Sequence, residues 1–241
     1  MPAVFVRGVP DTVLVWRLLL ERLTRRDAVC LSLPGFGNKR PAGFSPDKDN
    51  YTNWLVDELK KIKGPIDLVG HDWGSLLVTR AVSIAPDLVR SWSGGGAPLD
   101  HDYVWHDTAQ IWQTPGKGEE LMKNFAGEAL AMGLNAQGIP QEQAREAARN
   151  IDDEMKTCIL ALYRSAVRTA DDWVAGLKQV KAPGLILWGE RDPYAAPRFG
   201  ERLADNTSGR FALVQGAGHW YQVEKPELVA RELEIFWAGL S

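Results

Sequence analysis

Three short segments of the chain carry the residue types that hydrolytic chemistry needs. Asp72 stands at the centre of Gly-His-Asp-Trp-Gly, Asp192 ends the run Trp-Gly-Glu-Arg-Asp, and His219 is fourth in Gly-Ala-Gly-His-Trp. A histidine paired with a carboxylate can take a proton from water, and a second carboxylate can act as a nucleophile. The order nucleophile, acid, histidine, with separations of 120 and 27 residues, predicts a triad of Asp72, Asp192 and His219.

The residues around Asp72 predict a tight turn between a strand and a helix. The pattern small-x-nucleophile-x-small follows an apolar run at 66–69 and precedes a helical pattern at 76–85. Such a turn leaves no room for side chains two positions before and after the nucleophile, which explains Gly70 and Gly74. The alternative is that Asp72 only caps the following helix, a role that aspartate fills well.

Aspartate in place of serine favours attack at saturated carbon. A carboxylate attacking an acyl carbon would produce a strained anhydride, whereas displacement at an sp³ carbon gives an alkyl ester on Asp72. His219, held and charge-balanced by Asp192, would then activate a water that attacks the carboxyl carbon of that ester. The expected substrate is a small apolar electrophile, and these steps need neither a metal nor an organic cofactor.

Short apolar runs alternate with helical patterns on both sides of the chain's middle third. This alternation predicts an α/β fold with a mostly parallel sheet and helices on both faces. The expected strands are 3–6, 28–33, 66–69, 89–93, 184–188 and 211–214, and the expected helices between and after them are 13–23, 51–62, 76–85, 198–204 and 226–240.

The middle of the chain contains no convincing strand pattern. Residues 119–134, 141–166 and 170–180 each have the spacing of a helix. An all-helical segment inside a parallel α/β pattern indicates a cap over the ends of the strands, where open α/β sheets bind ligands. The predicted organisation is therefore a core at 1–97, a helical cap at 98–180 and a second part of the core at 181–241.

These features together resemble the α/β-hydrolase superfamily, within it the branch of epoxide hydrolases and haloalkane dehalogenases, and the resemblance covers nearly the whole chain. Residues 7–10, Arg-Gly-Val-Pro, are similar to that branch's His-Gly-x-Pro oxyanion motif, with Arg7 in place of the histidine. Residues 33–37, Leu-Pro-Gly-Phe-Gly, are similar to its loop after the next strand. The resemblance implies an α/β-hydrolase fold in which the backbone N–H groups of Val9 and Trp73 face the oxyanion.

The resemblance also implies that cap tyrosines protonate the oxygen of an opening epoxide. Tyr163 lies 29 residues before Asp192, about where relatives carry the later of two such tyrosines. Tyr103 is the candidate for the earlier one, with Trp105, His106 and Trp112 as competing pocket-lining residues. Tyr163 also shares a helical stripe with apolar residues, so packing inside the cap is its alternative role. The predicted reaction is hydrolysis of an epoxide to a diol.

Two other functions stay open on the sequence. A haloalkane dehalogenase needs N–H donors for the departing halide, and the Trp73 indole is one candidate, with Trp105 or Trp112 as the second. A catalytically weak protein that binds small molecules in the same pocket is the other alternative, because Arg7 departs from the oxyanion motif.

Composition and charge narrow the partners and the location. The chain has 28 Lys and Arg against 31 Asp and Glu, a formal net charge of −3, without a long basic block, which argues against nucleic acid or a membrane surface as partner. The two cysteines, Cys30 and Cys158, fit neither a disulfide framework nor a metal site, and no signal-peptide pattern opens the chain, so we expect a cytoplasmic protein.

Relatives usually carry extra strands before the oxyanion motif. Their absence predicts an open sheet edge and a possible homodimer.

Overall fold

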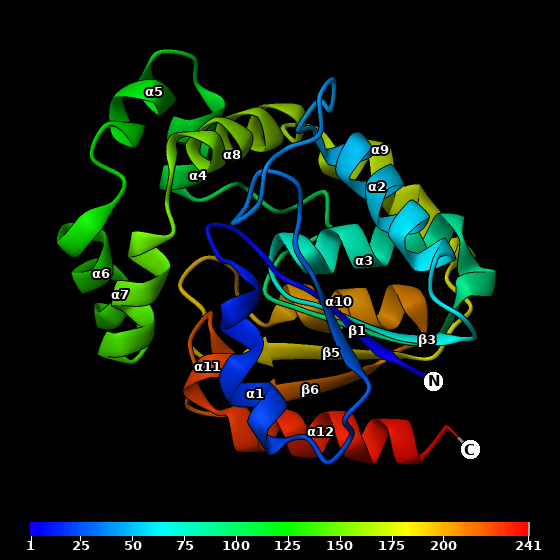
Figure 1. Ribbon diagram of the computed structural model, residues 1–241. Helices are drawn as coiled ribbons and strands as arrows, with labels where there is room; N and C mark the ends of the chain where they lie inside the picture. The colour runs from blue at the N-terminus through cyan, green and yellow to red at the C-terminus, as the bar shows by residue number, and fades with distance from the viewer. Residues whose placement is uncertain (241) are drawn as a thin grey trace.

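The computed structural model describes residues 1–240 and contains one six-stranded sheet (Figure 1). The strand order is β2-β1-β3-β4-β5-β6, and every neighbouring pair runs parallel. The strands are β1 (Ala3–Val6), β2 (Ala28–Leu31), β3 (Ile66–Gly70), β4 (Val89–Gly94), β5 (Gly184–Gly189) and β6 (Arg210–Val214). Because all strands run the same way, their carboxyl ends meet at one edge of the sheet. The predicted parallel sheet is confirmed.

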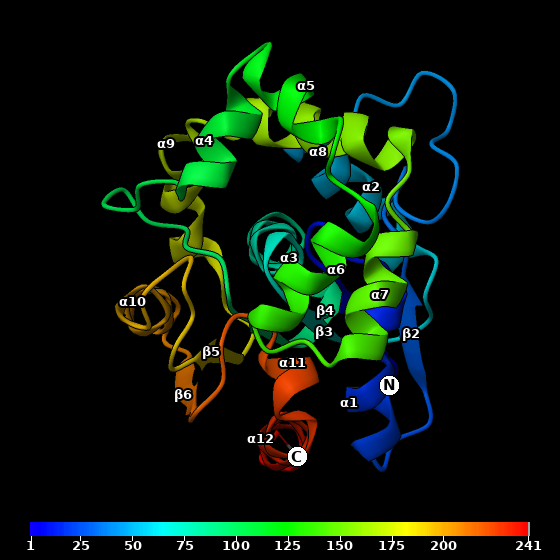
Figure 2. The same ribbon diagram turned by 90° about the vertical axis from the view of Figure 1, so that its left-hand side faces the viewer.

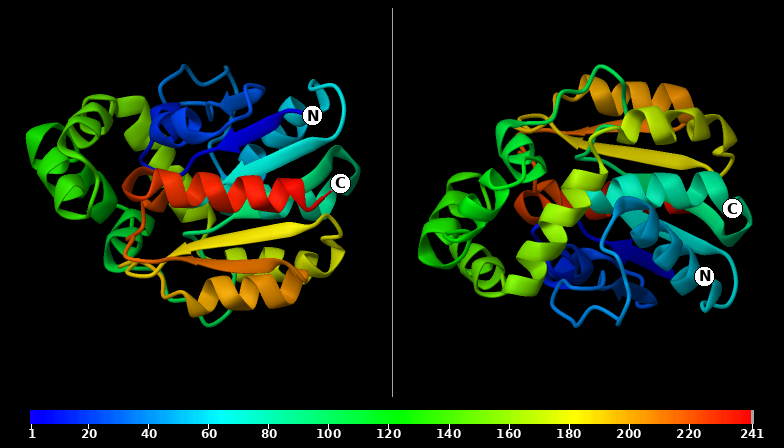
Figure 3. Two further views of the ribbon diagram at one scale, coloured as in Figure 1. Left: turned by 90° about the horizontal axis from the view of Figure 1, so that it is seen from below. Right: turned by 90° about the horizontal axis from the view of Figure 1, so that it is seen from above.

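Helices cover both faces of this sheet. Figure 1 shows α2 (Lys48–Lys60), α3 (Trp73–Ile84) and α10 (Arg198–Thr207) on one side, and α1 (Arg17–Arg22) and α12 (Pro226–Ala238) on the other. The views from below and above in Figure 3 separate the same two layers. Short 3-10 helices at Val13–Trp16 (η1) and Pro86–Leu88 (η2) and the short α11 (Tyr221–Glu224) complete the core.

Two apolar layers, one on each face of the sheet, form the core. Adjacent residues of β3 belong to different layers: Leu68 packs with the α2 and α3 side, and Val69 packs with the α1 and α12 side. Successive side chains of a strand point to opposite faces, so a strand buried on both faces needs a continuous apolar run. This requirement accounts for the uninterrupted apolar sequence of β1, whose four residues are all buried.

The helices of the middle segment include α6 and α7, which lie beyond the carboxyl ends of the strands at the left of Figure 1. Figure 2, which views the molecule from that side, shows α4 to α8 in an arc above and beside α3. They are α4 (Asp107–Gln113), α5 (Lys117–Met122), α6 (Gly127–Ala136), α7 (Gln141–Arg149) and α8 (Asp153–Ser165). The chain then returns through α9 (Thr169–Trp173) and the 3-10 helix η3 (Val174–Gln179), which packs against α3 before β5 begins.

Two helices predicted as continuous are each broken in the structure. The predicted helix 119–134 is interrupted before Gly127, whose positive φ of 67° lies outside the α-helical region. The predicted helix 141–166 is interrupted at 150–152, because the Asp152 carboxylate accepts the Met155 N–H (2.7 Å) and starts α8 anew. The breaks separate α6 and α7, which pack against each other, from α5 and α8.

The strand order places a topological switch point between β1 and β3. From β1 the chain crosses to β2 on one side and then to β3 on the other. Loops that leave the carboxyl ends of two such strands diverge, and ligands of open α/β sheets bind between them. Val9 follows β1 and Asp72 follows β3, so both leave the sheet at this point.

The opposite end of the sheet holds a buried ion-pair network around Asp67. This carboxylate, which is fully buried, accepts hydrogen bonds from Arg90 (2.7 and 2.9 Å), Arg25 (3.0 Å) and Ser91 (2.6 Å). Burial alone would raise the pKa of Asp67, but these donors outweigh it and hold the pKa below its usual range. The network joins β3, β4 and the loop before β2, away from the candidate site.

The part of the chain that the structure describes contains no helix long and apolar enough to cross a membrane. Strand β2 forms one edge of the sheet, and among residues 1–240 it pairs only with β1.

Candidate active site

Asp72 occupies the strained turn that the glycine pattern predicts. Its backbone angles are φ 52° and ψ −126°, in the positive-φ region that side chains rarely adopt. A Cβ on Gly74 would lie 2.1 Å from the Val6 carbonyl oxygen, and one on Gly70 would lie 2.4 Å from the Gly74 carbonyl oxygen. The Asp72 side chain makes no capping hydrogen bond to α3, so the helix-cap alternative is wrong.

The Asp72 carboxylate lies between a backbone donor and the His219 ring. Its Oδ1 accepts the Val9 N–H at 2.7 Å, and its Oδ2 lies 3.6 Å from Nε2 of His219. Burial would raise the pKa of Asp72, but the hydrogen bond and charge of His219 outweigh burial, and the Trp73 N–H adds to the effect. The pKa of Asp72 is therefore lowered, and its carboxylate is ionised at neutral pH.

His219 is held from its other side by Asp192. The ring Nδ1 lies 2.8 Å from Oδ2 of Asp192, and the Asp192 Oδ1 accepts the N–H groups of Tyr194 (2.8 Å) and Ala195 (3.2 Å). Burial opposes the charged ring, yet the two carboxylates outweigh it and raise the pKa of His219 to about 10. The structure thus brings the three predicted triad side chains together at the carboxyl edge of the sheet.

His71, next to Asp72 in the chain, does not line the cavity. Its Nε2 donates to the His219 carbonyl oxygen (2.8 Å), and its Nδ1 accepts from the Gln222 amide (3.1 Å). Burial lowers the pKa of His71 to about 4, so the ring is neutral. His71 therefore holds the loop that carries His219.

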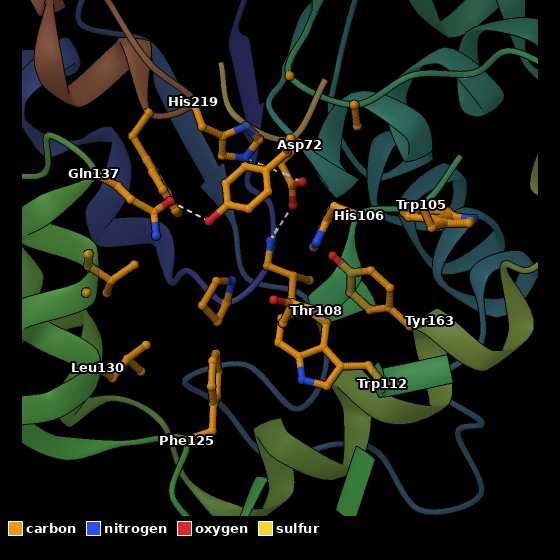
Figure 4. Close-up of a pocket in the computed structure, with 18 of the residues that line it drawn as sticks. Asp72, Trp105, His106, Thr108, Trp112, Phe125, Leu130, Gln137, Tyr163 and His219 are labelled. Atoms are coloured by element: carbon orange, nitrogen blue, oxygen red, sulfur yellow. Dashed lines mark hydrogen bonds and ion pairs between the residues drawn. The ribbon is translucent and has the colours of Figure 1, made fainter. Parts of the chain in front are cut away.

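A cavity of about 210 Å³ opens above Asp72 and His219, with the cap helices forming its far walls (Figure 4). Its walls are largely apolar and rich in aromatic side chains, and no Lys or Arg of residues 1–240 lines it. The aromatic side chains include Tyr103, Trp105, Trp112, Phe125, Tyr163 and Tyr194. Among the wall residues near α6, Ala129, Gly133 and Gln137 are exposed, which places the cavity mouth beside this helix.

The predicted binding residues occupy different positions around this cavity. Val9, Tyr103 and Tyr163 line it. The Tyr163 hydroxyl is directed toward the part of the cavity that holds Asp72, as Figure 4 shows, and burial raises its pKa well above the usual range. The Tyr103 hydroxyl instead donates to the Tyr194 carbonyl oxygen (3.3 Å).

The Trp73 side chain does not line the cavity. It is buried against Trp105 (ring centroids 6.0 Å apart, 17° between planes) and against the edge of Tyr163 (5.4 Å). Its indole N–H has no aligned hydrogen-bond partner among the described residues. Trp73 acts on Asp72 through its backbone N–H. Because the side chain lies outside the cavity, the expectation that its indole reaches a leaving group is wrong.

Sequence reasoning missed Tyr194 and Gln137 and undervalued His106. Tyr194 lies two residues after Asp192, packs against the His219 ring (4.9 Å) and donates its hydroxyl to the Gln137 side chain of the cap. His106 lines the cavity, and its Nδ1 accepts the Ala109 N–H (3.3 Å), which places the proton of the neutral ring on Nε2. The sequence signal that could have indicated Tyr194 was its position two residues after Asp192, the candidate acid of the triad.

The sheet, the strained turn and the acid–histidine pair define an α/β hydrolase. Residues 3–232 match the model of the alpha/beta hydrolase family, and the chain belongs to this family.

Curated relatives and solved structures are similar at low identity. The chain is 21% identical to (E)-2-((N-methylformamido)methylene)succinate hydrolase of Acinetobacter baylyi (98% of this chain, 89% of the relative). It is 25% identical to epoxide hydrolase 3 of Mus musculus (98% and 70%). Its fold is similar to haloalkane dehalogenase DbeA of Bradyrhizobium elkani, with a TM-score of 0.76 at 22% identity (99% and 90%).

Proposed function

We propose that the protein hydrolyses small uncharged epoxides to diols through a covalent ester on Asp72. One observation carries the proposal: an ionised Asp72 in a strained turn faces a phenol, Tyr163, across a largely apolar cavity. A nucleophile and an acid on opposite sides of the substrate are what epoxide opening needs. Similarity to the mouse epoxide hydrolase supports the same reaction class.

In the first step, Oδ2 of Asp72 attacks an epoxide carbon and the ring C–O bond breaks. The electron pair of that bond goes to the epoxide oxygen, which takes a proton from the Tyr163 hydroxyl. Oδ1 stays on the Val9 N–H, so Oδ2 is the free oxygen on the His219 side. The product of this step is an alkyl ester on Asp72.

In the second step, His219 takes a proton from a water whose oxygen attacks the ester carboxyl carbon. Esterification removes the charge of Asp72, which is one of the two carboxylates that raise the pKa of His219. The His219 pKa therefore falls when the ester forms, and the ring gives up its proton, which restores the Tyr163 hydroxyl. The neutral ring is then the base that takes the proton from water. The tetrahedral oxyanion on Oδ1 accepts the Val9 N–H and collapses, which breaks the bond between the carboxyl carbon and Oδ2. The departing diol oxygen takes the proton that His219 had taken from water, and the new carboxyl group of Asp72 returns its own proton to His219. The diol thus leaves with one added water in the overall reaction.

The walls of the cavity support a compact, uncharged substrate. A volume of about 210 Å³ is small for a ligand pocket and matches a compact molecule. Anionic substrates would meet the Asp72 carboxylate without a compensating Lys or Arg among the described lining residues. Aromatic walls favour an apolar or aromatic substituent on the epoxide.

Haloalkane dehalogenation is the second candidate, and Trp112 is the observation that favours it. This side chain lines the cavity, and its buried indole N–H has no partner in residues 1–240. A buried N–H without an acceptor is a donor available to a halide. Halide release is therefore measured alongside diol release.

The test is intact-mass analysis of a His219→Gln variant incubated with a panel of epoxides and haloalkanes. Without the base, the ester should form but not hydrolyse, so the protein gains the mass of one substrate, or of a haloalkane less its halide. The matched control, His219→Gln combined with Asp72→Asn, should gain none.

Two outcomes would overturn the proposal. Diol release by the wild type without a mass gain in His219→Gln would mean direct attack by water, with Asp72 as a base. A wild type that binds these compounds without diol or halide release would indicate a non-catalytic binding pocket.

A further inference from the structure

Arg7 lies directly behind the backbone donor of the candidate site. It follows β1, its side chain is fully buried, and its guanidinium carbon lies 4.2 Å from the centroid of the Phe36 ring. Its Nη1 donates a hydrogen bond to the Gly8 carbonyl oxygen. The Nε and Nη2 atoms have no hydrogen-bond partner among residues 1–240, so this carbonyl is the acceptor on which the guanidinium acts.

The Gly8–Val9 peptide is therefore engaged at both ends. Its carbonyl accepts from the Arg7 guanidinium, and its N–H donates to Oδ1 of Asp72 at 2.7 Å. Gly8 is pressed against the nucleophile, because a Cβ there would lie 2.3 Å from Oδ1 of Asp72. The peptide is thus fixed between a cation and the oxygen that becomes the oxyanion.

We infer that Arg7 is a positioning residue that polarises the Gly8–Val9 peptide and so strengthens the Val9 N–H as the oxyanion donor. A cation on the carbonyl oxygen withdraws electrons from the amide nitrogen, and hydrogen bonds in such chains strengthen one another. The effect is largest in a buried, low-dielectric setting. This inference rests on the proposed ester intermediate. It gives a role to Arg7, which stands where the resembled oxyanion motif has histidine.

The charge of Arg7 is maintained in its buried setting. Burial lowers the pKa of Arg7 to about 10, and the neighbouring Asp11 and Asp72 carboxylates oppose that fall. The guanidinium is consequently protonated at neutral pH. Asp11 itself is buried and accepts the Trp220 indole N–H (3.1 Å), and its charge interacts with that of Arg7.

The two half-reactions should respond differently to loss of this cation. Oδ1 is part of a charged carboxylate before alkylation, neutral in the ester, and fully charged in the tetrahedral intermediate. A stronger Val9 donor therefore favours hydrolysis of the ester and slightly restrains the attack by Asp72. A merely structural role for Arg7 would slow both steps.

The experiment compares Arg7→Met with Arg7→Lys, each made in the wild-type chain and in an Asp11→Asn background. The background prevents an unpaired buried carboxylate from destabilising the Met variant, and Asp11→Asn alone is the matched control. Rapid-quench intact-mass measurements with one epoxide follow the formation and the decay of the ester. We expect Arg7→Met to slow decay about tenfold without slowing formation, and Arg7→Lys to restore part of the decay rate.

A second measurement does not depend on turnover. In ¹H–¹⁵N spectra, the Val9 amide proton should move upfield in Arg7→Met relative to wild type and to Asp11→Asn. An unchanged Val9 resonance, an unchanged decay rate, or equal slowing of both steps would overturn the role of Arg7. Absence of any ester in His219→Gln would instead overturn the proposed function, while the Val9 resonance would still decide whether Arg7 polarises the peptide.

Discussion

The His219 ring lies between two carboxylates, with Nδ1 2.8 Å from Asp192 and Nε2 3.6 Å from Asp72. Removing one carboxylate should make the charged ring less favourable in its buried position. We expect Asp72→Asn to lower the pKa of His219 from its value of about 10. NMR titration of the His219 ring measures this, and the chain has only 4 histidines to assign.

The control for this titration is Asp57→Asn, which removes an exposed carboxylate paired with Lys60 and should leave the His219 ring unchanged. The raised His219 pKa also stabilises the fold. That contribution is complete below the unfolded-state pKa of about 6.5 and is lost as pH rises through about 10. An unchanged His219 pKa in Asp72→Asn would contradict the ion pair.

Tyr163→Phe tests the acid that the proposed epoxide reaction requires. The change keeps the ring that packs against Trp73 and Trp112 and removes only the hydroxyl. A positioned proton donor contributes roughly 10²–10⁴ in rate, so ester formation from an epoxide should slow by about that factor. Single-turnover mass measurements report this step.

Tyr103→Phe is the matched control for that substitution, because the Tyr103 hydroxyl donates to the Tyr194 carbonyl and should affect alkylation far less. Equal diol formation by Tyr163→Phe and wild type would exclude Tyr163 as the acid. Retained halide release in Tyr163→Phe would favour dehalogenation.

Gly133 offers a test of the cavity mouth. It lies within α6 and lines the cavity, and a Cβ at this position would meet no atom within 4 Å. Gly133→Leu should therefore fold normally, narrow the mouth, and raise KM for bulky epoxides several-fold more than for the smallest ones. Gly133→Ala is the control, expected to add about 0.5–1 kcal/mol of stability with little effect on KM. Equal effects on bulky and small substrates would place the entrance elsewhere.

Asp67→Asn addresses stability without touching the site. This substitution leaves Arg90 and Arg25 without their buried carboxylate, and we expect a loss of about 3 kcal/mol in the free energy of unfolding. Because the Asp67 pKa is lowered, its contribution is present above the unfolded Asp pKa near 4 and is lost as pH falls. Urea titrations at two pH values, with Asp57→Asn as the exposed control, measure both effects.

The core and the triad could be predicted because their signals are local. A strand buried on both faces requires an apolar run, as in β1, and the strained turn at Asp72 requires glycine at 70 and 74. Each triad residue follows a strand directly, so parallel strands bring them to one edge.

The orientation of side chains in the cavity could not be predicted in this way. The Trp73 indole turns toward Trp105 because aromatic side chains from the cap fill the space around it, and this packing depends on contacts distant in sequence. The same holds for Tyr103, whose hydroxyl donates a hydrogen bond to the Tyr194 carbonyl oxygen in a loop 91 residues away. The helical spacing of apolar residues likewise continues across the break at Asp152. The sequence pattern does not show the break, because it depends on one hydrogen bond from the Met155 N–H to the Asp152 carboxylate.

The carboxylates and the imidazole of the candidate triad come from loops that directly follow strands, whereas Tyr163 and His106 come from the helical insertion between β4 and β5. The candidate nucleophile and base, and the hydroxyl that we propose as the acid, thus come from separate stretches of the sequence. Replacement of the helical stretch by that of another α/β hydrolase would exchange Tyr163, His106 and the cavity walls while leaving Asp72, His219 and the Val9 N–H in place. Under the proposed mechanism, this division makes the chain a suitable scaffold for changing which substrate bond is broken without rebuilding the groups that would hydrolyse the ester.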